Sequence, residues 1–245
     1  MLELGWQRVS PSSSRPSAAS EPSGHYFSAQ PDTTSDPRTV RLHLPDLSLT
    51  LTTDRGVFAR DGVDPGTKLL LLQGPEPTPG DTELVDLGCG YGPIALTLAR
   101  RNPQARIWAV DVNERARSLC RTNAADNGLG NVTVVGPDDF PSDLAVDRIW
   151  SNPPIRIGKA ALHELLSRWF DRLARGGTAH LVVQKHLGSD SLHRWLERSG
   201  WATTRRRSQS AYRLLDVSAR IDVSAPIDDA SDPDSGPVPG PTTSE

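Results

Sequence analysis

The order of apolar and polar positions along the chain predicts strands and helices in alternation. Residues 82–87 form an apolar, β-prone run, and residues 94–100 after them have the pattern of a helix. Short apolar runs separated by amphipathic segments are typical of a parallel sheet covered by helices. The later strands are predicted at 107–111, 132–135, 148–151 and 179–184, and the later helices at 160–173 and 191–198.

The pattern changes at both ends of this alternation. Residues 39–44 and 47–53 alternate apolar and polar positions around Pro45 and Asp46, which predicts an antiparallel hairpin, and a short helix is predicted over 68–73. Only a short polar turn separates residues 201–207 from 211–217, so a second hairpin is expected to close the sheet. The predicted fold class is α/β, with a mostly parallel sheet, an antiparallel C-terminal hairpin and an N-terminal β-hairpin extension.

The two ends of the chain have a different composition. Residues 1–22 are rich in Ser, Pro and Ala, and residues 224–245 in Pro, Asp, Ser and Gly, so neither is expected to bury enough apolar surface to order itself. The folded domain is therefore predicted at 23–223. The net charge of −3 hides a basic domain, because residues 218–245 carry one Arg, five Asp and one Glu.

No apolar run approaches the roughly 18 residues of a membrane span, and the N-terminal residues have no hydrophobic stretch fit for a secretory signal. We therefore expect a cytoplasmic protein that does not contact the membrane. The two cysteines, Cys89 and Cys120, suggest neither a disulfide framework nor a metal site.

A glycine-rich turn follows the strand at 82–87, where Asp86 precedes Gly88, Gly90 and Gly92 in the pattern D-x-G-x-G-x-G. Glycine permits backbone angles that a Cβ obstructs and lets a ligand approach the main chain. Such a triplet can be a flexible loop, but here a strand precedes it and a helix follows it. The next strand ends at Asp111, 19 residues past Gly92, where a carboxylate can accept hydrogen bonds from both ribose hydroxyls of a nucleotide-like cofactor.

The spacing of the glycines separates two cofactors. The dinucleotide fingerprint is G-x-G-x-x-G, whereas these glycines alternate strictly and follow Asp86. A carboxylate there would repel phosphates bound at a helix N-terminus, but it suits S-adenosylmethionine, which carries an ammonium and a sulfonium. We therefore predict that S-adenosylmethionine binds here, with Asp86 near its methionine end and with Asp111 and Val112 at its ribose. Asp138 and Asp139 follow the next strand and either bind the adenine amino group or form a solvated turn.

The segment Asn152-Pro153-Pro154 follows the strand at 148–151, at the sheet edge where α/β proteins bind ligands. An amine on an aromatic ring is a poor nucleophile because its lone pair is spread into the ring. Two acceptors aimed at its N–H groups favour rehybridisation, and the Asn152 side-chain oxygen and the Pro153 carbonyl can supply them, with Pro154 holding that carbonyl outward in an extended loop. The alternative is that the segment only turns the chain; its place in the sheet favours a catalytic role.

Several basic residues are candidates for binding nucleic-acid phosphates. Three of them, Arg205, Arg206 and Arg207, are consecutive, and a charged, solvated edge strand explains them equally well. The candidates are Arg156, Lys159, Lys185, Arg205, Arg206, Arg207 and Arg213.

The glycine turn and Asn-Pro-Pro are accompanied by other segments in a fixed order, and together they resemble the RsmC-type small-domain methyltransferases. These are class I, S-adenosylmethionine-dependent enzymes that methylate the N2 amine of guanine in ribosomal RNA. The resemblance implies the class I strand order, a cofactor site that includes Gly66, Thr67 and Asn152, a target pocket formed by residues 152–155, and ribosomal RNA or a ribosomal subunit as the partner. The other segments are His25-Tyr-Phe-Ser28, Thr53-Asp-Arg-Gly-Val-Phe58, Val63-Asp-Pro-Gly-Thr67 with the leucines after it, and Ile155-Arg156 after Asn-Pro-Pro.

Two departures from the family pattern bear on the substrate. Ile155 stands where amine methyltransferases usually have an aromatic residue that stacks on a flipped base. The long members of the family also carry an additional N-terminal domain, which the 24 residues before His25 are not expected to supply. Two alternatives therefore stay open: methylation of a glutamine amide in a protein, and a catalytically silent RNA-binding or ribosome-assembly factor. The intact glycine motif and Asn-Pro-Pro argue against the second.

Overall fold

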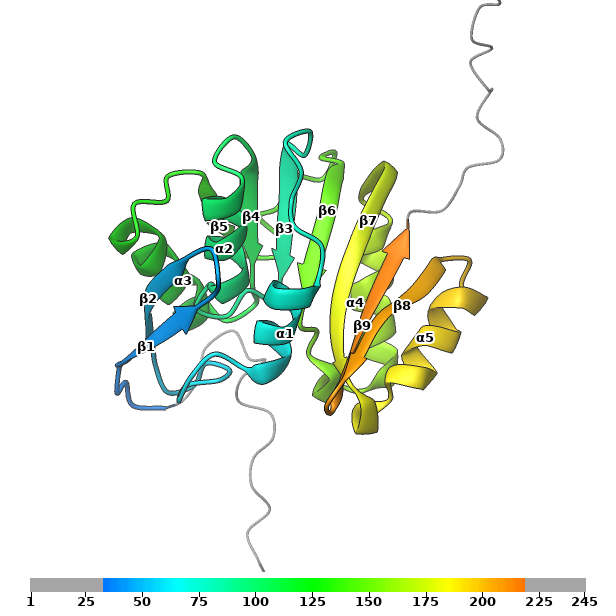
Figure 1. Cartoon of the computed structure of the whole chain (residues 1–245), viewed down its shortest axis with the longest axis horizontal. Coiled ribbons are helices and arrows are strands. Elements are labelled where there is room, and N and C mark those ends of the chain that lie inside the picture. The colour runs from blue at the N-terminus through cyan, green and yellow to red at the C-terminus, as the bar shows by residue number, and fades with distance from the viewer. Residues whose placement is uncertain (1–32, 219–245) are drawn as a thin grey trace, which may run out of the picture.

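A seven-stranded sheet in the order β5-β4-β3-β6-β7-β9-β8 forms the centre of the molecule (Figure 1). The computed structural model describes residues 33–218. The tails predicted at 1–22 and 224–245, the outer boundaries of the domain and the motif beginning at His25 lie outside these residues. The strands are β3 (Glu83–Leu87), β4 (Arg106–Val110), β5 (Val132–Val135), β6 (Val146–Ser151), β7 (Leu173–Gln184), β8 (Ala202–Gln209) and β9 (Tyr212–Ser218).

The first five of these strands run parallel, and β9 pairs antiparallel with both β7 and β8. The chain adds β4 and β5 on one side of β3 and then returns to add β6 on the other. This reversal is the topological switch point at which open α/β sheets bind ligands, at the carboxyl ends of the strands. Those ends lie along the lower edge of the sheet in Figure 1.

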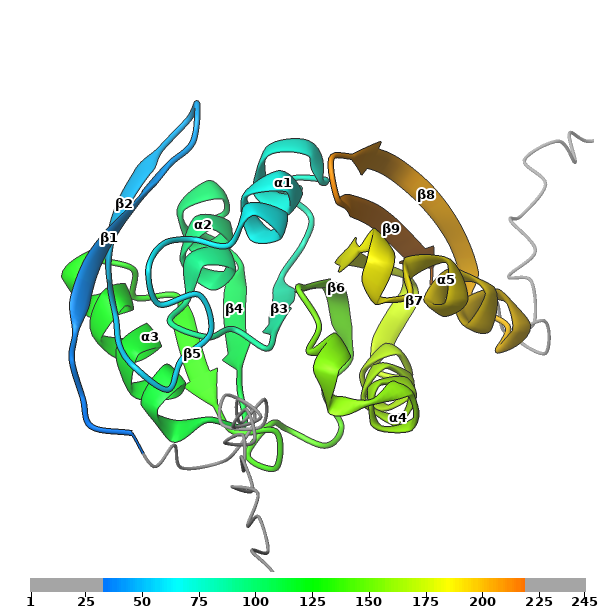
Figure 2. The same ribbon diagram turned by 90° about the horizontal axis from the view of Figure 1, so that it is seen from below.

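Helices cover both faces of the sheet, as Figure 2 shows. One face packs against α1, α2 and α3 through a cluster that includes Leu70, Leu96 and Cys120. The other packs against α4 and α5 through a cluster that includes Leu166 and Trp169. The helices are α1 (Pro65–Gln73), α2 (Pro93–Arg101), α3 (Glu114–Asp126), α4 (Lys159–Phe170) and α5 (Ser189–Arg198), with 3-10 turns at Ile155–Ile157 and Lys185–Leu187.

The N-terminal hairpin, β1 (Arg38–His43) and β2 (Ser48–Thr53), is a separate two-stranded sheet. It packs on α3, where Asn123 accepts a hydrogen bond from the Thr52 N–H at 2.7 Å and donates to the Thr52 carbonyl at 2.8 Å. Leu49 and Leu51 of β2 are fully buried in the same cluster as α3. The predicted hairpin is therefore present, and it covers the helix that follows Asp111.

The helix α1 and the strand β7 begin at least three residues earlier than the sequence pattern predicts. The helix predicted at 68–73 begins at Pro65, because Asp64 accepts a hydrogen bond from the Thr67 N–H at 3.0 Å and caps it, with proline in the first turn. The strand predicted at 179–184 begins at Leu173, ahead of Gly176 and Gly177. The irregularity in its pairing with β6, between Val146 and Arg148, accommodates these glycines.

Candidate active site

The carboxyl ends of β3, β4 and β6 open onto a cavity of about 900 Å³, a size typical of small-molecule sites. One wall contains the glycine turn after β3 and the residues after β4. A second wall is residues 152–156 after β6, together with Gln184 and Tyr212. The third wall is the loop at 55–65, between β2 and α1.

The glycine turn presents bare main chain to this cavity. Gly88 has a φ of +78° and Gly90 a φ of +54°, conformations that L residues rarely adopt. An added Cβ at either position would meet nothing within 4 Å, so protein packing does not require glycine there. Both residues line the cavity, and a side chain would take up space inside it. Gly92, in contrast, is the residue before α2 and does not line the cavity.

Asp111 lies directly after β4 and lines the cavity beside the glycine turn. Its Oδ2 accepts a hydrogen bond from the Gly90 N–H at 2.9 Å, and its Oδ1 accepts one from the Asn113 N–H at 2.9 Å. Burial raises the pKa of this carboxyl, and the two backbone hydrogen bonds oppose that shift. Each oxygen keeps a further lone pair for a ligand hydroxyl. Val112, the next residue, is 42% exposed and lines the same cavity.

Asp86 is fully buried beneath the glycine turn. Its Oδ2 accepts a hydrogen bond from the Ala95 N–H in the first turn of α2 at 2.8 Å. Its Oδ1 has no hydrogen-bond partner among residues 33–218. Burial raises the pKa of Asp86 to about 8; the Ala95 N–H bond opposes this shift and the nearby Asp111 charge adds to it. A buried carboxyl with an unpartnered oxygen is costly, and a nearby cation would offset that cost.

Asn152 is held by two residues of the α1 N-terminus. Its Nδ2 donates to Asp64 Oδ2 at 2.9 Å and to Thr67 Oγ1 at 3.0 Å. A carboxylate offers only acceptors, so the nitrogen end of the amide must face Asp64. The oxygen end is therefore the one left to face the cavity that Asn152 lines. The hydrogen bonds to the amide nitrogen thus orient the Asn152 side-chain oxygen, which is the acceptor that the sequence pattern predicts.

The loop after Asn152 is tighter than the extended conformation expected for it. Pro154 has φ −75° and ψ 72°, and the Ile155 N–H donates to the Pro153 carbonyl at 2.8 Å, which is an inverse γ-turn. The expectation that Pro154 holds an extended loop is corrected in this respect, because proline's fixed φ also suits this turn. The Pro153 carbonyl keeps one lone pair, and Ile155 lines the cavity while it packs against the α4 cluster.

Gly66 and Thr67 lie at the start of α1 and are buried. Thr67 lines a second, smaller cavity of about 30 Å³, together with Asn152 and Gly88. Packing constrains Gly66, because an added Cβ would lie 2.6 Å from the Tyr212 ring. The close approach of α1 to β9 therefore requires glycine at 66, and Gly66 does not line either cavity.

Asp138 and Asp139 are not brought into the cavity. The Asp139 N–H donates to the Gly136 carbonyl at 3.2 Å, and this turn directs both carboxylates to solvent. Asp138 lies 3.5 Å from Arg168 on α4. Of the segment after β5, Pro137 is the residue that lines the cavity.

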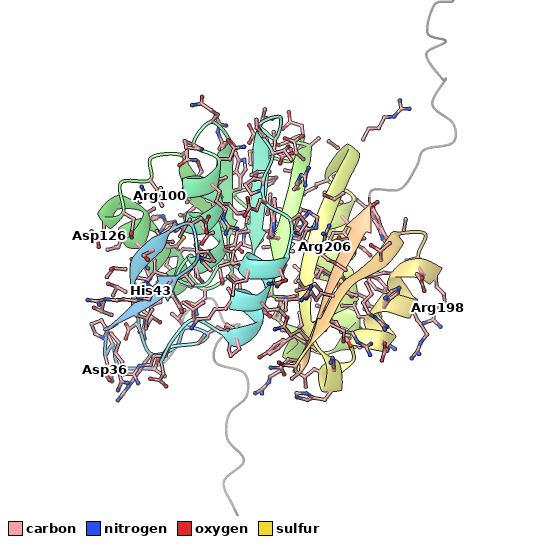
Figure 3. All side chains as sticks on the ribbon, in the orientation of Figure 1. Asp36, His43, Arg100, Asp126, Arg198 and Arg206 are labelled. Atoms are coloured by element: carbon pink, nitrogen blue, oxygen red, sulfur yellow. The ribbon has the colours of Figure 1, made fainter. Side chains whose placement is uncertain are left out.

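Most of the basic residues on the C-terminal hairpin are engaged in ion pairs. Arg205 and Arg213 both pair with Asp190 on α5. Arg206, which lies over the C-terminal strands in Figure 3, donates to Asp216 Oδ2 at 2.6 Å. These contacts agree with a charged edge strand, although paired guanidinium groups retain donors for phosphate.

The other basic candidates differ in their surroundings. Lys185 Nζ donates to the Ser210 carbonyl at 2.6 Å. Arg156 is exposed and lines the cavity, shortly after the Asn-Pro-Pro segment, and Lys159 is the first residue of α4. Within residues 33–218, no ion pair is formed by Arg156, Lys159 or Arg207.

Two residues of the site were not singled out by reasoning from the residues alone. Asp64 entered only through the family resemblance, although Asp followed by Pro and Gly is a helix-start signal that could have identified it as a cap. Phe58 is 46% exposed and lines the cavity. No periodicity indicates that an aromatic side chain in this loop faces a cavity.

Two other kinds of feature are absent from the part of the chain that the structure describes. It contains no helix long and apolar enough to cross a membrane. Nor does residue range 33–218 contain a group of three or more His, Cys, Asp or Glu placed to hold a metal ion.

Comparison with protein families places this site in context. Residues 48–215 match the family model described as methyltransferase small domain. The uncharacterized protein YbxB of Bacillus subtilis (strain 168) is 38% identical over 178 residues, which cover 71% of this chain and 88% of that protein. Ribosomal RNA small subunit methyltransferase C of Pseudomonas aeruginosa (strain LESB58) is 35% identical over 176 residues, which cover 65% of this chain and 52% of that protein.

A solved structure gives the same picture. The T. thermophilus 16S rRNA N2 G1207 methyltransferase (RsmC), in complex with AdoMet and guanosine, superimposes with a TM-score of 0.66 and 26% identity. The match covers 78% of this chain and 52% of that chain. This chain therefore spans about half the length of the curated RNA methyltransferases that it matches.

Proposed function

The chain belongs to the methyltransferase small domain family, and from that membership we propose that it transfers the methyl group of S-adenosylmethionine to the N2 amine of a guanine in small-subunit ribosomal RNA. The observation that carries the proposal is the orientation of Asn152. Its amide nitrogen is held by Asp64 and Thr67, and its oxygen is left to face the cavity beside the glycine turn.

The residues around the cavity fit the cofactor. Gly88 and Gly90 leave open space against the main chain, and Asp111 can accept hydrogen bonds from ribose hydroxyls. Asp86 has a buried, unpartnered oxygen behind the glycine turn, and a positively charged group nearby would favour its ionised form. When bound, S-adenosylmethionine supplies a methyl group on a positively charged sulfur. Gly88, Gly90, Asp111 and Val112, which line the cavity, would hold it, and the buried Asp86 would act from behind the glycine turn.

Asn152 supplies the chemistry for the acceptor. Its side-chain oxygen accepts an N–H of the target amine, which draws the nitrogen lone pair out of conjugation with the ring. The remaining lone pair of the Pro153 carbonyl can accept the second N–H. These two acceptors favour the rehybridised nitrogen that attacks, so they contribute more in the transition state than in the ground state. An amide oxygen is not a base at neutral pH, so the displaced proton leaves to water.

The choice of ribosomal RNA rests on the relatives. Two of them are named as ribosomal RNA methyltransferases, and the structure of one of these contains guanosine. The Asn-Pro-Pro loop requires only that the acceptor nitrogen be planar, and the nitrogen of a glutamine amide is also planar. The substrate is therefore the part of the proposal that an experiment must decide.

The test is nucleoside mass spectrometry of ribosomal RNA from three strains: wild type, a strain lacking the protein, and that strain carrying Asn152→Ala. We expect the deletion strain to lose one N2-methylguanosine, which the wild-type chain restores and Asn152→Ala does not. Incubation of small subunits from the deletion strain with tritiated S-adenosylmethionine should then label RNA. Equal N2-methylguanosine content in all three strains would refute the guanine assignment, and label in protein would indicate the glutamine alternative.

A further inference from the structure

Two of the exposed large apolar side chains in residues 33–218 line the cavity. Phe58 is 46% exposed, Val112 is 42% exposed, and both line it. Exposed apolar side chains that face a cavity mark the places where a ligand can be buried. Leu72 on α1 is similarly exposed at 45% but lies outside the cavity.

The two cavity residues have different neighbours. Val112 follows Asp111, the proposed partner of the cofactor ribose. Phe58 also lines the smaller cavity, together with Asn152 and the glycine turn. Phe58 is therefore close to Asn152, the side chain that is proposed to receive the target amine.

The backbone on either side of Phe58 is tied to the cofactor half of the sheet. Asn113 Nδ2 donates to the Gly56 carbonyl at 2.8 Å, and the Tyr91 hydroxyl donates to the Ala59 carbonyl at 3.4 Å. Ala59 has a φ of +58°, a strained conformation for a residue with a Cβ. The backbone is therefore strained directly after Phe58, in a loop that the hydrogen bonds from Asn113 and Tyr91 hold in place.

Ile155 leaves a chemical requirement unmet. It occupies the position after Asn-Pro-Pro, and an aliphatic side chain there cannot stack on a base as an aromatic ring does. Part of it is also committed to the α4 cluster. A flipped base needs a flat apolar surface to replace the neighbours with which it stacked.

We propose that Phe58 is this surface: the target base stacks on its ring, which takes over the role that an aromatic residue at 155 would have. The inference rests on the proposed function to the extent that the acceptor is a planar base. It adds a substrate-binding residue on the loop between β2 and α1, across the cavity from the Asn-Pro-Pro loop. The base then enters between Phe58 and Ile155, with its exocyclic amine at Asn152.

Kinetics of three variants test this. Phe58→Leu keeps an apolar side chain and removes the ring, Phe58→Tyr keeps the ring, and Leu72→Ala is a matched control at an exposed apolar residue outside the cavity. The substrate is small subunits from the deletion strain. We expect Phe58→Leu to lower kcat/KM for the subunit by roughly 10- to 100-fold, the range of base–aromatic stacking. Phe58→Tyr should stay within a few fold of wild type, and Leu72→Ala should match it.

A double variant separates stacking from loop structure. Adding Ile155→Phe to Phe58→Leu restores a ring on the other side of the base, so part of the lost kcat/KM should return. Thermal melting should place all variants near the wild type, since the Phe58 side chain is half exposed. Calorimetry should give the Phe58→Leu variant the wild-type affinity for S-adenosylmethionine. A tenfold loss of that affinity with unchanged kcat/KM for the subunit would instead assign Phe58 to the cofactor and overturn the proposal.

Guanosine binding makes the inference independent of turnover. In full-length protein saturated with S-adenosylhomocysteine, a stacked ring should shift the guanosine H8 resonance upfield on titration, and Phe58→Leu should abolish that shift. If wild-type protein shows the shift but methylates no ribosomal RNA, the proposed function fails and the stacking role stands. If wild-type protein methylates the subunit and Phe58→Leu changes neither kcat/KM nor the shift, the stacking role fails and the proposed function stands. Absence of any Phe58-dependent shift also counts against stacking.

Discussion

Asp64 Oδ2 accepts a hydrogen bond from Asn152 Nδ2 at 2.9 Å, and this contact joins the cap of α1 to the loop after β6. The same oxygen accepts the Thr67 N–H at 3.0 Å, and Thr67 Oγ1 accepts the second Asn152 N–H, also at 3.0 Å. The residue that begins a helix therefore also sets which end of the Asn152 amide faces the cavity. Folding of α1 and orientation of the acceptor oxygen are coupled through one carboxylate.

Replacement of Asn152 tests the acceptor directly. Asn152→Ala removes an oxygen that matters while the amine becomes a nucleophile, so kcat should fall by roughly 100-fold or more while the affinity for S-adenosylmethionine changes by only a few fold. Single-turnover kinetics and calorimetric titration measure the two quantities. Full turnover by this variant on any identified substrate would contradict the proposed mechanism.

Asp64 is a positioning residue, and its two roles can be separated. Asp64→Asn keeps a good helix cap but adds donors, so the Asn152 amide loses the partner that fixes its orientation. We expect kcat to fall about tenfold with little change in Tm or in the KM for S-adenosylmethionine. Asp64→Ala should lose the cap as well, at a cost of about 0.5–2 kcal/mol in the free energy of unfolding. An unchanged kcat in Asp64→Asn would mean that the carboxylate serves only α1.

The sequence pattern predicted the parts of this fold whose physics is local. The apolar runs that became β3, β4 and β6 are short, bounded by turns and mostly buried, so their pattern is unambiguous. The order of the strands depends on contacts between distant segments, so it was expected only from the family resemblance. The observed sheet confirms the strand order, and the family match confirms the resemblance. The start of β7 was not predicted, because Arg175, Gly176 and Gly177 are not typical of a strand. Pairing of Leu173 with Val146 of β6 makes this segment part of the strand.

The site was predictable where one segment carries its own chemistry. The glycine turn, Asp111 and Asn152 each follow a strand, and parallel strands bring their carboxyl ends to one edge. Contacts between distant segments were not predictable in this way. The ring of Tyr212 against Gly66 explains that glycine by packing, and Phe58 reaches the cavity on a loop whose conformation depends on Asn113 and Tyr91.

Asp111 should be the main determinant of cofactor affinity among the acidic residues after the strands. Hydrogen bonds to a charged acceptor contribute roughly 1.5–3 kcal/mol each, so Asp111→Ala should weaken S-adenosylmethionine binding at least tenfold. Asp138→Ala is a suitable control, because Asp138 is exposed on the turn after β5 and does not line the cavity. Calorimetry measures the affinity of both variants for S-adenosylmethionine. Weaker binding by Asp138→Ala would favour a contact of Asp138 with adenine over a solvated turn. Unchanged affinity in Asp111→Ala would refute the ribose assignment.

Asp86 makes the stability of the cofactor-free protein depend on pH. Its pKa is raised from 3.8 to about 8, chiefly by burial, so the folded protein holds a proton that the unfolded chain releases at lower pH. The stabilisation is complete below pH 4 and is lost progressively as pH rises to about 8. Asp86→Asn cannot titrate and can still accept the Ala95 N–H. Its Tm should therefore gain on the wild-type Tm between pH 5 and pH 8 in thermal melts and then level off; a constant difference would contradict the raised pKa.

Cofactor binding should remove the same proton. At pH 7 the raised pKa keeps Asp86 mostly protonated in the free protein, with Oδ2 bonded to the Ala95 N–H and Oδ1 unpartnered within residues 33–218. A cation bound beyond the glycine turn stabilises the carboxylate and lowers its pKa, so binding of S-adenosylmethionine at pH 7 should release a fraction of a proton. Calorimetric titrations in two buffers with different ionisation enthalpies measure this number. We expect release from the wild type and much less from Asp86→Asn, since the control variant retains Asp111 and the glycine turn but has no proton to lose at residue 86. Equal release from both proteins would place the titrating group elsewhere and would remove Asp86 from the cofactor site.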